Sequence, residues 1–346
     1  MNNFSLPQSW LRWLPWLLVV AAALILPIVL PPFRLNLLGR FLSLGIVALG
    51  IDLIWGYTGL LSLGQGIFFA LGGYALGMHL QLGSLEPGQL PEFFSLYGVK
   101  SLPGFWQPFE SPIFTFFAIW IVPALVAWLL GYLVFRNRIK GVYFSILTQA
   151  ALLVFFNFFN GQQKLINGTN GLKTDTAKVF GDLVGSDLVQ KELFWLTVAL
   201  VVAAWWLCRW LTRGRFGDVL VAIRDDEPRL RFTGYNTTSY KTLVFAVAGA
   251  LAGISGALYT VQSGIVSPQL MAVPFSIEMV IWVAVGGRGT LVGAVLGAVL
   301  INFAKSLVSE QLPETWLFIQ GGLFLLVVTA LPDGLLGRWW RRELKP

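Results

Sequence analysis

The sequence is poor in charge and in the residue types that most catalytic and metal sites require. Only 12% of its 346 residues are charged, and it contains one cysteine and one histidine. Cys208 can form no internal disulfide, and His79 alone cannot supply the ligand cluster of a metal-dependent hydrolase. No lysine follows a glycine, which excludes the Gly-Lys-Ser/Thr loop that holds phosphate in ATPases. We therefore expect no catalysis, and no cofactor bound by this chain.

Apolar residues dominate instead. They make up 56% of the chain, which includes 15 tryptophans and 27 phenylalanines, and such a composition is too apolar for a soluble domain. A membrane helix needs about 20 mainly apolar residues. Ten stretches fit that template, so we predict an all-α, polytopic bundle of about ten transmembrane helices. They cover approximately residues 14–32, 37–55, 57–80, 112–135, 141–160, 192–211, 241–263, 270–287, 290–308 and 315–331.

Three of these stretches have features that bear on whether each is a complete membrane-spanning helix. The first, 14–32, is longer than the apolar region of a signal peptide and lacks a cleavage pattern, so we interpret it as a retained span. The third, 57–80, contains six glycines, and the eighth, 270–287, runs into Gly286-Gly287-Arg288-Gly289. Non-helical backbone at membrane depth is tolerated where protein buries it. Spans three and eight could therefore be broken or re-entrant.

Glycine pairs four residues apart allow helices to approach closely in a bilayer. We expect these pairs to pack helices within this chain, with a subunit interface as the alternative. They are Gly73/Gly77, Gly249/Gly253 and Gly293/Gly297.

The basic residues predict the orientation, because loops that stay in the cytoplasm keep lysine and arginine. With both ends of the chain inside, sixteen of the 24 basic residues fall on the cytoplasmic side, and the net charge of +7 needs no nucleic acid. Residues 1–346 then form one transmembrane domain of the cell inner membrane. Its extracytoplasmic loops are predicted at 81–111 and 161–191, and its cytoplasmic loop at 212–240.

Polar side chains within the apolar stretches mark where a solute could pass. Gln65 and Gln149 are predicted to lie deep in spans three and five, and their amides carry the donors and acceptors that a neutral polar solute needs. Asn157, Tyr57 and Asp52 complete the candidates for the path. The alternative for the two glutamines is hydrogen bonding between helices.

Three charged residues of the apolar stretches are predicted nearer the outer face, where long side chains can extend to the headgroups. They are Arg40, Glu278 and Lys305.

The segment 212–240 is the most structured soluble element that the sequence predicts. Asp218 suits a helix N-cap after Gly217, and Pro228 is a helix stop. A simple connection between two spans needs only a few residues, so a long basic loop indicates a docking surface. Adsorption to anionic headgroups is the alternative. The residues predicted to make the docking contact are Phe216, Gly217, Val219, Ala222, Ile223, Arg224 and Asp225.

Several motifs, in order along nearly the whole chain, resemble the branched-chain amino-acid and urea class of ABC permeases. Residues 55–66, WGYTGLLSLGQG, followed by GGY at 72–74, resemble the glycine-rich span of that class. Phe216-Gly217, the AIR of 222–224 and the GYN of 234–236 resemble its ATPase-facing loop.

Within that class, three further motifs are similar to the urea permeases. They are RIKGVYFSILTQA at 138–150, RDDE at 224–227 and GGRGT at 286–290. The segment 166–172, INGTNGL, departs from the more glycine-rich urea-type stretch and resembles the general class.

The resemblance implies a permease that imports urea by alternating access, with branched-chain amino acids or short amides as the alternative. Net charge cannot discriminate, since urea and a zwitterion are both neutral overall. The implied partners are a second homologous permease chain, two ABC ATPase subunits that carry ATP and Mg²⁺, and an extracytoplasmic solute-binding protein. Val219, Ala222 and Ile223 would then fill a groove on the ATPase.

Two functions of other classes compete with this interpretation. A self-sufficient channel or secondary transporter would act without an ATPase, and the basic loop 212–240 argues against it. An intramembrane enzyme is disfavoured, because no nucleophile and base pair stands out.

Overall fold

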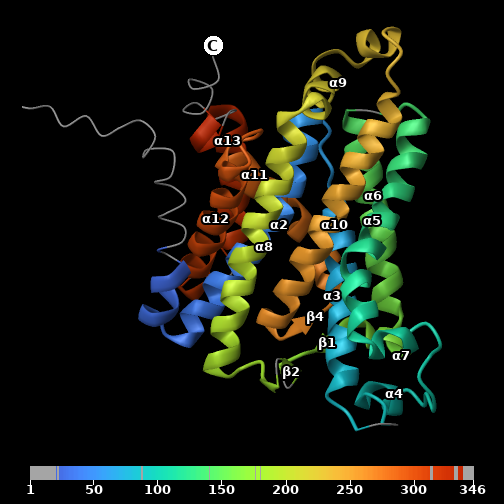
Figure 1. Ribbon diagram of the computed structural model, residues 1–346, viewed down its shortest axis with the longest axis vertical. Coiled ribbons are helices and arrows are strands. Elements are labelled where there is room, and N and C mark those ends of the chain that lie inside the picture. The colour runs from blue at the N-terminus through green and yellow to red at the C-terminus, as the bar shows by residue number, and fades with distance from the viewer. Residues whose placement is uncertain are drawn as a thin grey trace, which may run out of the picture.

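A computed structural model describes residues 21, 23–86, 89–139, 141–175, 177–179, 181–311, 315–330 and 334–337. The long helices run side by side along the longest axis of the molecule (Figure 1). In the described part of the chain, six helices are long and apolar enough to cross a membrane. They are α2 (Pro32–Thr58), α5 (Pro112–Arg136), α6 (Val142–Gly161), α8 (Asp187–Arg213), α10 (Thr237–Ser263) and α12 (Val292–Gln311). The chain is thus an all-α, multi-pass membrane protein.

Helices α2 and α10 form the centre of the bundle. Their apolar middles are 78% and 72% buried, whereas those of α5, α6 and α8 are 22%, 17% and 28% buried. Helix α10 packs on α2, α5 and α3 (Gln65–Gly83). The backbones touch there, since a Cβ on Gly256 would lie 1.8 Å from the Phe69 carbonyl oxygen. Close packing of this kind, rather than exclusion of water, holds helices together inside a bilayer.

The glycine pairs pack within the chain, as predicted. A Cβ on Gly253 would lie 2.3 Å from the Ile119 carbonyl oxygen of α5, and one on Gly297 would lie 2.0 Å from the Trp282 carbonyl oxygen. These glycines therefore bring helices of this one chain together.

Both glycine-rich spans are broken, as the sequence indicated. Helix α3 begins only at Gln65, after the non-helical residues 59–64. Helix α11 (Val273–Gly286) has 14 residues and follows β4 (Ile265–Val266) and the 3₁₀ helix η3 (Pro268–Met271). The two interruptions meet, since a Cβ on Gly66 would lie 2.8 Å from the Leu270 carbonyl oxygen. Protein thus buries this non-helical backbone away from lipid.

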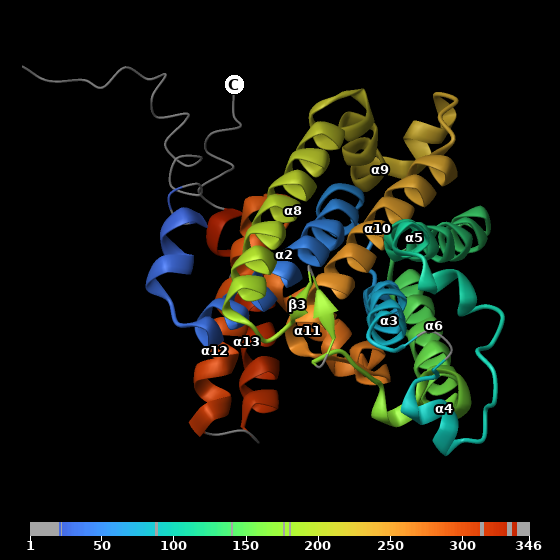
Figure 2. The same cartoon turned by 60° about the horizontal axis from the view of Figure 1, so that its bottom comes forward.

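The two ends of the bundle carry different elements (Figures 1 and 2). Helix α9 (Arg215–Phe232) lies at one end, and α4 (Glu92–Leu96) and α7 (Gln163–Ile166) lie at the other. The predicted loops 81–111 and 161–191 therefore lie opposite 212–240. Which end faces the cytoplasm stays a prediction.

The remaining described elements are short or peripheral. Strand β1 (Leu172–Lys173) pairs antiparallel with β4, and β2 (Lys178–Val179) pairs antiparallel with β3 (Asp182–Leu183). The others are η1 (Gln107–Glu110), η2 (Gly168–Asn170) and α13 (Trp316–Ala330), which covers the tenth predicted span. Residues 14–20 and 22 of the first predicted span, 14–32, lie outside the described residues, and residues 21 and 23–29 of that span are helical.

Candidate functional site

Gln65 lies where non-helical backbone becomes α3, in the interior of the bundle. Its side chain is 1% exposed, and neither its amide oxygen nor its amide nitrogen has a hydrogen-bond partner among the described residues. The backbone on each side is held: the Leu63 N–H donates to Thr148 Oγ1 at 3.1 Å, and the Gly66 N–H donates to Ser276 Oγ at 3.3 Å. A buried polar group left without a partner costs about 1–3 kcal/mol. Gln65 is therefore a fixed, buried amide that a polar molecule could satisfy.

The other two amides of the predicted path lie on α6. Gln149 is half-buried and adjoins Thr148, which binds the segment before Gln65. Asn157 is exposed, and its Nδ2 donates to the Leu153 carbonyl oxygen of its own helix at 2.9 Å. Gln149 is thus half-buried one residue from a contact with the segment before Gln65, whereas Asn157 is exposed on α6.

Asp52 and Tyr57 hold the turn between α11 and α12. Asp52 is 0% exposed; its Oδ1 accepts the Gly289 N–H at 2.6 Å and its Oδ2 accepts the Leu291 N–H at 2.9 Å. The Tyr57 hydroxyl donates to the Gly289 carbonyl oxygen at 3.5 Å. A carboxylate at the start of α12 also favours that helix electrostatically. Asp52 therefore has hydrogen-bond partners in the fold itself, and the sequence alone did not reveal these partners.

Two of the sequence motifs meet at this turn. The Arg288 guanidinium lies 5.3 Å from the centre of the Trp55 ring. A Cβ on Gly56 would lie 2.7 Å from the Gly289 nitrogen. The stretches 55–57 and 286–290, which are far apart in the sequence, thus form one packed unit, and this explains why both need glycine.

Glu278 and Lys305 form an ion pair, whereas the sequence predicted only that their side chains extend to the headgroups. Glu278 is 3% exposed, and its Oε1 and Oε2 accept from Lys305 Nζ at 3.0 and 2.8 Å. Arg40 donates through Nε to the Gln262 carbonyl oxygen at 2.8 Å. A charge in hydrocarbon is costly unless it is paired, and neighbouring helices α11 and α12 provide the pair.

Helix α9 begins earlier than predicted and is broken once. It starts at Arg215 after the extended Gly214, so Asp218 lies in its first turn instead of capping it. Asp226 has non-helical angles, φ −154° and ψ 84°, two residues before Pro228. The Asp226 Oδ1 then accepts the Arg229 N–H at 3.1 Å, and a final turn follows. The predicted helix stop at Pro228 thus interrupts α9 instead of ending it.

The apolar face of α9 packs on the chain itself. Leu220 and Ile223 are 0% and 5% exposed within the main core, and a Cβ on Gly217 would lie 2.1 Å from the Thr212 carbonyl oxygen. Phe216 stacks on the Tyr240 ring at 5.4 Å. This burial differs from the expectation that Ile223 fills a groove on another protein, because α2 and α8 already cover that face.

The outward face of α9 is polar, with half-buried apolar residues at its edge. Val219 and Ala222 are half-buried, whereas Arg224 and Asp225 are exposed. Arg224 donates to the Gly56 carbonyl oxygen at 3.0 Å and to Asp225 Oδ1 at 3.1 Å. Arg224 and Asp225 border a cavity of about 300 Å³ that also reaches the start of the 59–64 segment. Docking at α9 would thus use its polar face.

A buried carboxylate joins the last turn of α9 to the start of α10, and we call Glu227, Arg231, Thr237 and Lys241 the α9–α10 joint. Glu227 Oε1 accepts from Lys241 Nζ at 2.8 Å, from Thr237 Oγ1 at 2.9 Å and from Arg231 Nη2 at 2.5 Å. Lys241 is 2% exposed and its Nζ lies 4.9 Å from the centre of the Phe135 ring of α5. Sequence reasoning missed the joint, since residues fourteen apart across a turn show no pattern.

The electrostatics of the joint favour the charged carboxylate. Burial raises the pKa of Glu227, but the hydrogen bond and charge of Lys241, with the bonds from Thr237 and Arg231, outweigh it. The pKa of Glu227 therefore lies below its ordinary value of 4.5. The joint is an ionised network at neutral pH.

The amino-acid sequence is similar to those of known membrane permeases. Residues 33–328 match the family described as "Branched-chain amino acid transport system / permease component". The chain is 28% identical over 316 residues to the high-affinity branched-chain amino acid transport system permease protein LivM of Salmonella typhimurium, covering 84% of this chain and 67% of that protein. LivM of Escherichia coli is 27% identical over 314 residues, with the same coverage.

A further match, to a third protein, covers a shorter part of the chain. The autoinducer 2 import system permease protein LsrC of Yersinia pestis (strain Pestoides F) is 30% identical over 214 residues, which are 58% of each protein. No solved structure matches the chain.

Proposed function

The chain belongs to the family of permease components of branched-chain amino acid transport systems, and from that premise we propose that it is a membrane-spanning subunit of an ATP-driven importer for a small polar solute. Branched-chain amino acids are the first candidate, because the two LivM relatives are named for them. Urea is the second candidate, favoured by the motifs at 138–150, 224–227 and 286–290.

The proposed complex contains a second homologous permease chain, two ABC ATPase subunits and an extracytoplasmic solute-binding protein. The end of the bundle with α9 would face the cytoplasm and the ATPases, which bind ATP and Mg²⁺. The end with α4 and α7 would face the binding protein. This orientation is supported by the collection of basic residues on the α9 side.

One observation carries the proposal: α9 is tied to α10, the central helix, by a buried charged network. A separate ATPase can act on the spans only through a mechanical contact at the surface. The exposed Arg224 and Asp225 offer such a contact, and the α9–α10 joint continues it into the bundle. Helix α10 in turn packs on α2, α3 and α5. A displacement of α9 would therefore move the helices around Gln65.

Gln65 is the proposed solute contact within this chain. A solute stripped of water needs replacement hydrogen bonds, and the Gln65 amide is buried with both of its polar atoms unbonded among the described residues. Gln149, half-buried nearby on α6, is the second proposed contact. Asn157 is exposed on α6 and bonds to its own helix, so we propose no contact between it and the solute within this chain.

The test is uptake into proteoliposomes that contain the whole complex. Radiolabelled leucine and urea are offered separately, with ATP present or absent inside and with the binding protein outside. We expect ATP-dependent accumulation of leucine. Accumulation of urea alone would replace the first candidate by the second, and uptake by this chain without any ATPase would contradict the importer.

A further inference from the structure

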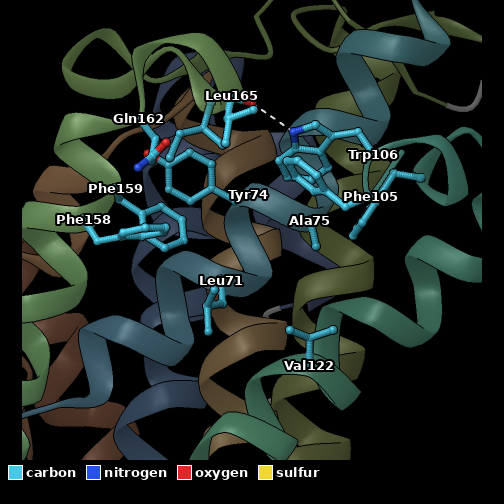
Figure 3. Close-up of a pocket in the computed structure, with 12 residues that line it drawn as sticks. Leu71, Tyr74, Ala75, Phe105, Trp106, Val122, Phe158, Phe159, Gln162 and Leu165 are labelled. Atoms are coloured by element: carbon cyan, nitrogen blue, oxygen red, sulfur yellow. Dashed lines mark hydrogen bonds between the residues drawn. The ribbon is translucent and has the colours of Figure 1, made fainter. Parts of the chain in front are cut away.

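A second cavity lies away from Gln65, between α3, α5, α6 and the segment around η1 (Figure 3). Its volume is about 370 Å³. Its walls are aromatic and aliphatic side chains, with Leu71 and Tyr74 from α3, Val122 from α5 and Phe159 from α6. No proposed step of solute transport uses this cavity.

The cavity has an apolar end and a more polar end. Leu71 and Val122 lie at one end, and Gln162 lies at the other, beside the Tyr74 ring (Figure 3). Val122 is ten residues into α5, or about 15 Å from the start of that helix, whereas Gln162 directly follows the last residue of α6. The long axis of the cavity therefore runs from the end of the bundle toward its middle.

Tyr74 is the unusual residue of this cavity. Its side chain is 2% exposed, and its hydroxyl has no hydrogen-bond partner among the described residues. Trp106, on the opposite wall, is satisfied, because its Nε1 donates to the Leu165 carbonyl oxygen at 2.9 Å. A buried hydroxyl without a partner is costly, so the Tyr74 hydroxyl is a donor that a bound molecule could use.

The cavity borders the membrane-facing surface. Phe105 and Phe158, which line it, are exposed, and Val122 is partly so. The helices that carry Val122 and Phe158 are the least buried long helices of the bundle. A molecule from the hydrocarbon layer can therefore enter from the side without passing through water.

We propose that this cavity binds one acyl chain of a bilayer phospholipid, with the ester carbonyl oxygen accepting a hydrogen bond from the Tyr74 hydroxyl. Carbon-lined walls cannot replace the water around an ammonium or carboxylate group, which disfavours an amino acid here. An acyl chain in the bilayer loses no water on entry. Its ester lies at the membrane interface and its tail lies deeper, in the same sense as the polar and apolar ends of the cavity.

The experiment uses the complete complex in lipid nanodiscs that contain a phospholipid with a photoreactive diazirine on its acyl chain. After illumination, the labelled residues are identified by peptide mass spectrometry. We expect labels on 71–75 and 158–166. Val122→Trp, which fills the apolar end, should remove them, whereas Val154→Trp, on the exposed face of α6, should leave them unchanged.

A second arm tests the hydroxyl. The ester-linked probe is compared with an ether-linked probe, which lacks the carbonyl oxygen. Wild type should prefer the ester by about fivefold, the effect of one hydrogen bond, and Tyr74→Phe should show no preference. Labels spread evenly over the exposed helices, an equal yield for both probes in wild type, or loss of the labels on addition of leucine would overturn the proposal. The last result would make the cavity a solute site.

Discussion

Two buried polar regions of the bundle, the α9–α10 joint and the site of Gln65, differ in whether the fold provides hydrogen-bond partners for their side chains. In the α9–α10 joint, one carboxylate oxygen of Glu227 accepts hydrogen bonds from three side chains. At Gln65, an even more deeply buried amide has no hydrogen-bond partner in the described part of the chain. A satisfied buried network fixes two elements relative to each other, whereas an unsatisfied group leaves an interaction for another molecule. The first region suits transmission of force, and the second suits contact with a solute.

The largest effect is expected at the joint. Glu227→Ala removes the carboxylate and leaves Lys241 buried without it, and breaking such a pair costs about 3–5 kcal/mol. We expect a lower thermal unfolding temperature and loss of the complex. Glu192→Ala is the matched control, because Glu192 is an exposed glutamate of α8 with no proposed role and even a surface ion pair contributes only about 0–1 kcal/mol. Equal unfolding temperatures for the two variants would contradict the comparison.

A somewhat smaller loss is expected at the turn before α12. Asp52→Ala removes a carboxylate that accepts two backbone N–H groups, and one hydrogen bond to a charged group contributes about 1.5–3 kcal/mol. The turn should then exchange its amide hydrogens faster, which hydrogen-exchange mass spectrometry of residues 286–292 measures. Unchanged exchange would show that Asp52 does not hold the turn, and Asp52 would again be a candidate for contact with the solute.

Gln65 should behave in the opposite way. Gln65→Leu removes an unbonded amide without removing any contact that the fold uses, so thermal stability should be unchanged or higher. Uptake should weaken, because each lost hydrogen bond to the solute contributes about 0.5–1.5 kcal/mol. Initial rates over a range of solute concentrations, with Gln149→Leu measured in parallel, check this. Normal uptake by both variants would show that both glutamines have only a structural role in the bundle.

The smallest effect is a dependence on pH. Since the folded-state pKa of Glu227 lies below its ordinary value of 4.5, its contribution to stability is fully present above that value and is lost as the pH falls through the folded-state pKa. Wild type and Glu227→Gln should therefore differ most in unfolding temperature above pH 4.5 and converge in more acidic buffer. A difference that grows on acidification would have the wrong sign.

Hydropathy predicted nearly all of the long helices, because the membrane requires each span to be apolar and about 20 residues long. Glycine content also indicated the break before Gln65 in span three and the end of α11 at Gly286. Pro228 predicted an interruption of α9, which the structure places at Asp226. The inward apolar face of α9 could not be predicted, since it depends on which helices surround Leu220 and Ile223.

The candidate site was only partly predictable. Gln65 stood out as a polar residue in an apolar stretch, and its isolation is visible only in three dimensions. Asp52 stood out for the same reason, yet its partners are amides more than 200 positions away. Glu278 and Lys305 form a pair across two helices that no local pattern encodes. A sequence shows which groups are costly to bury, and only the fold shows which of them it satisfies.

The most direct test of the account is the number of solute molecules imported per ATP hydrolysed when the α9–α10 joint is weakened without a large change of shape. Proteoliposomes with the whole complex carry wild type, Glu227→Gln or the control Glu192→Gln, at an exposed glutamate of α8 that has no proposed role, and uptake and phosphate release are measured together. We expect Glu227→Gln to retain the ATPase subunits and hydrolyse ATP while importing much less solute per ATP, and Glu192→Gln to match wild type. A ratio for Glu227→Gln equal to wild type would contradict the claim that force passes from α9 to α10 through Glu227.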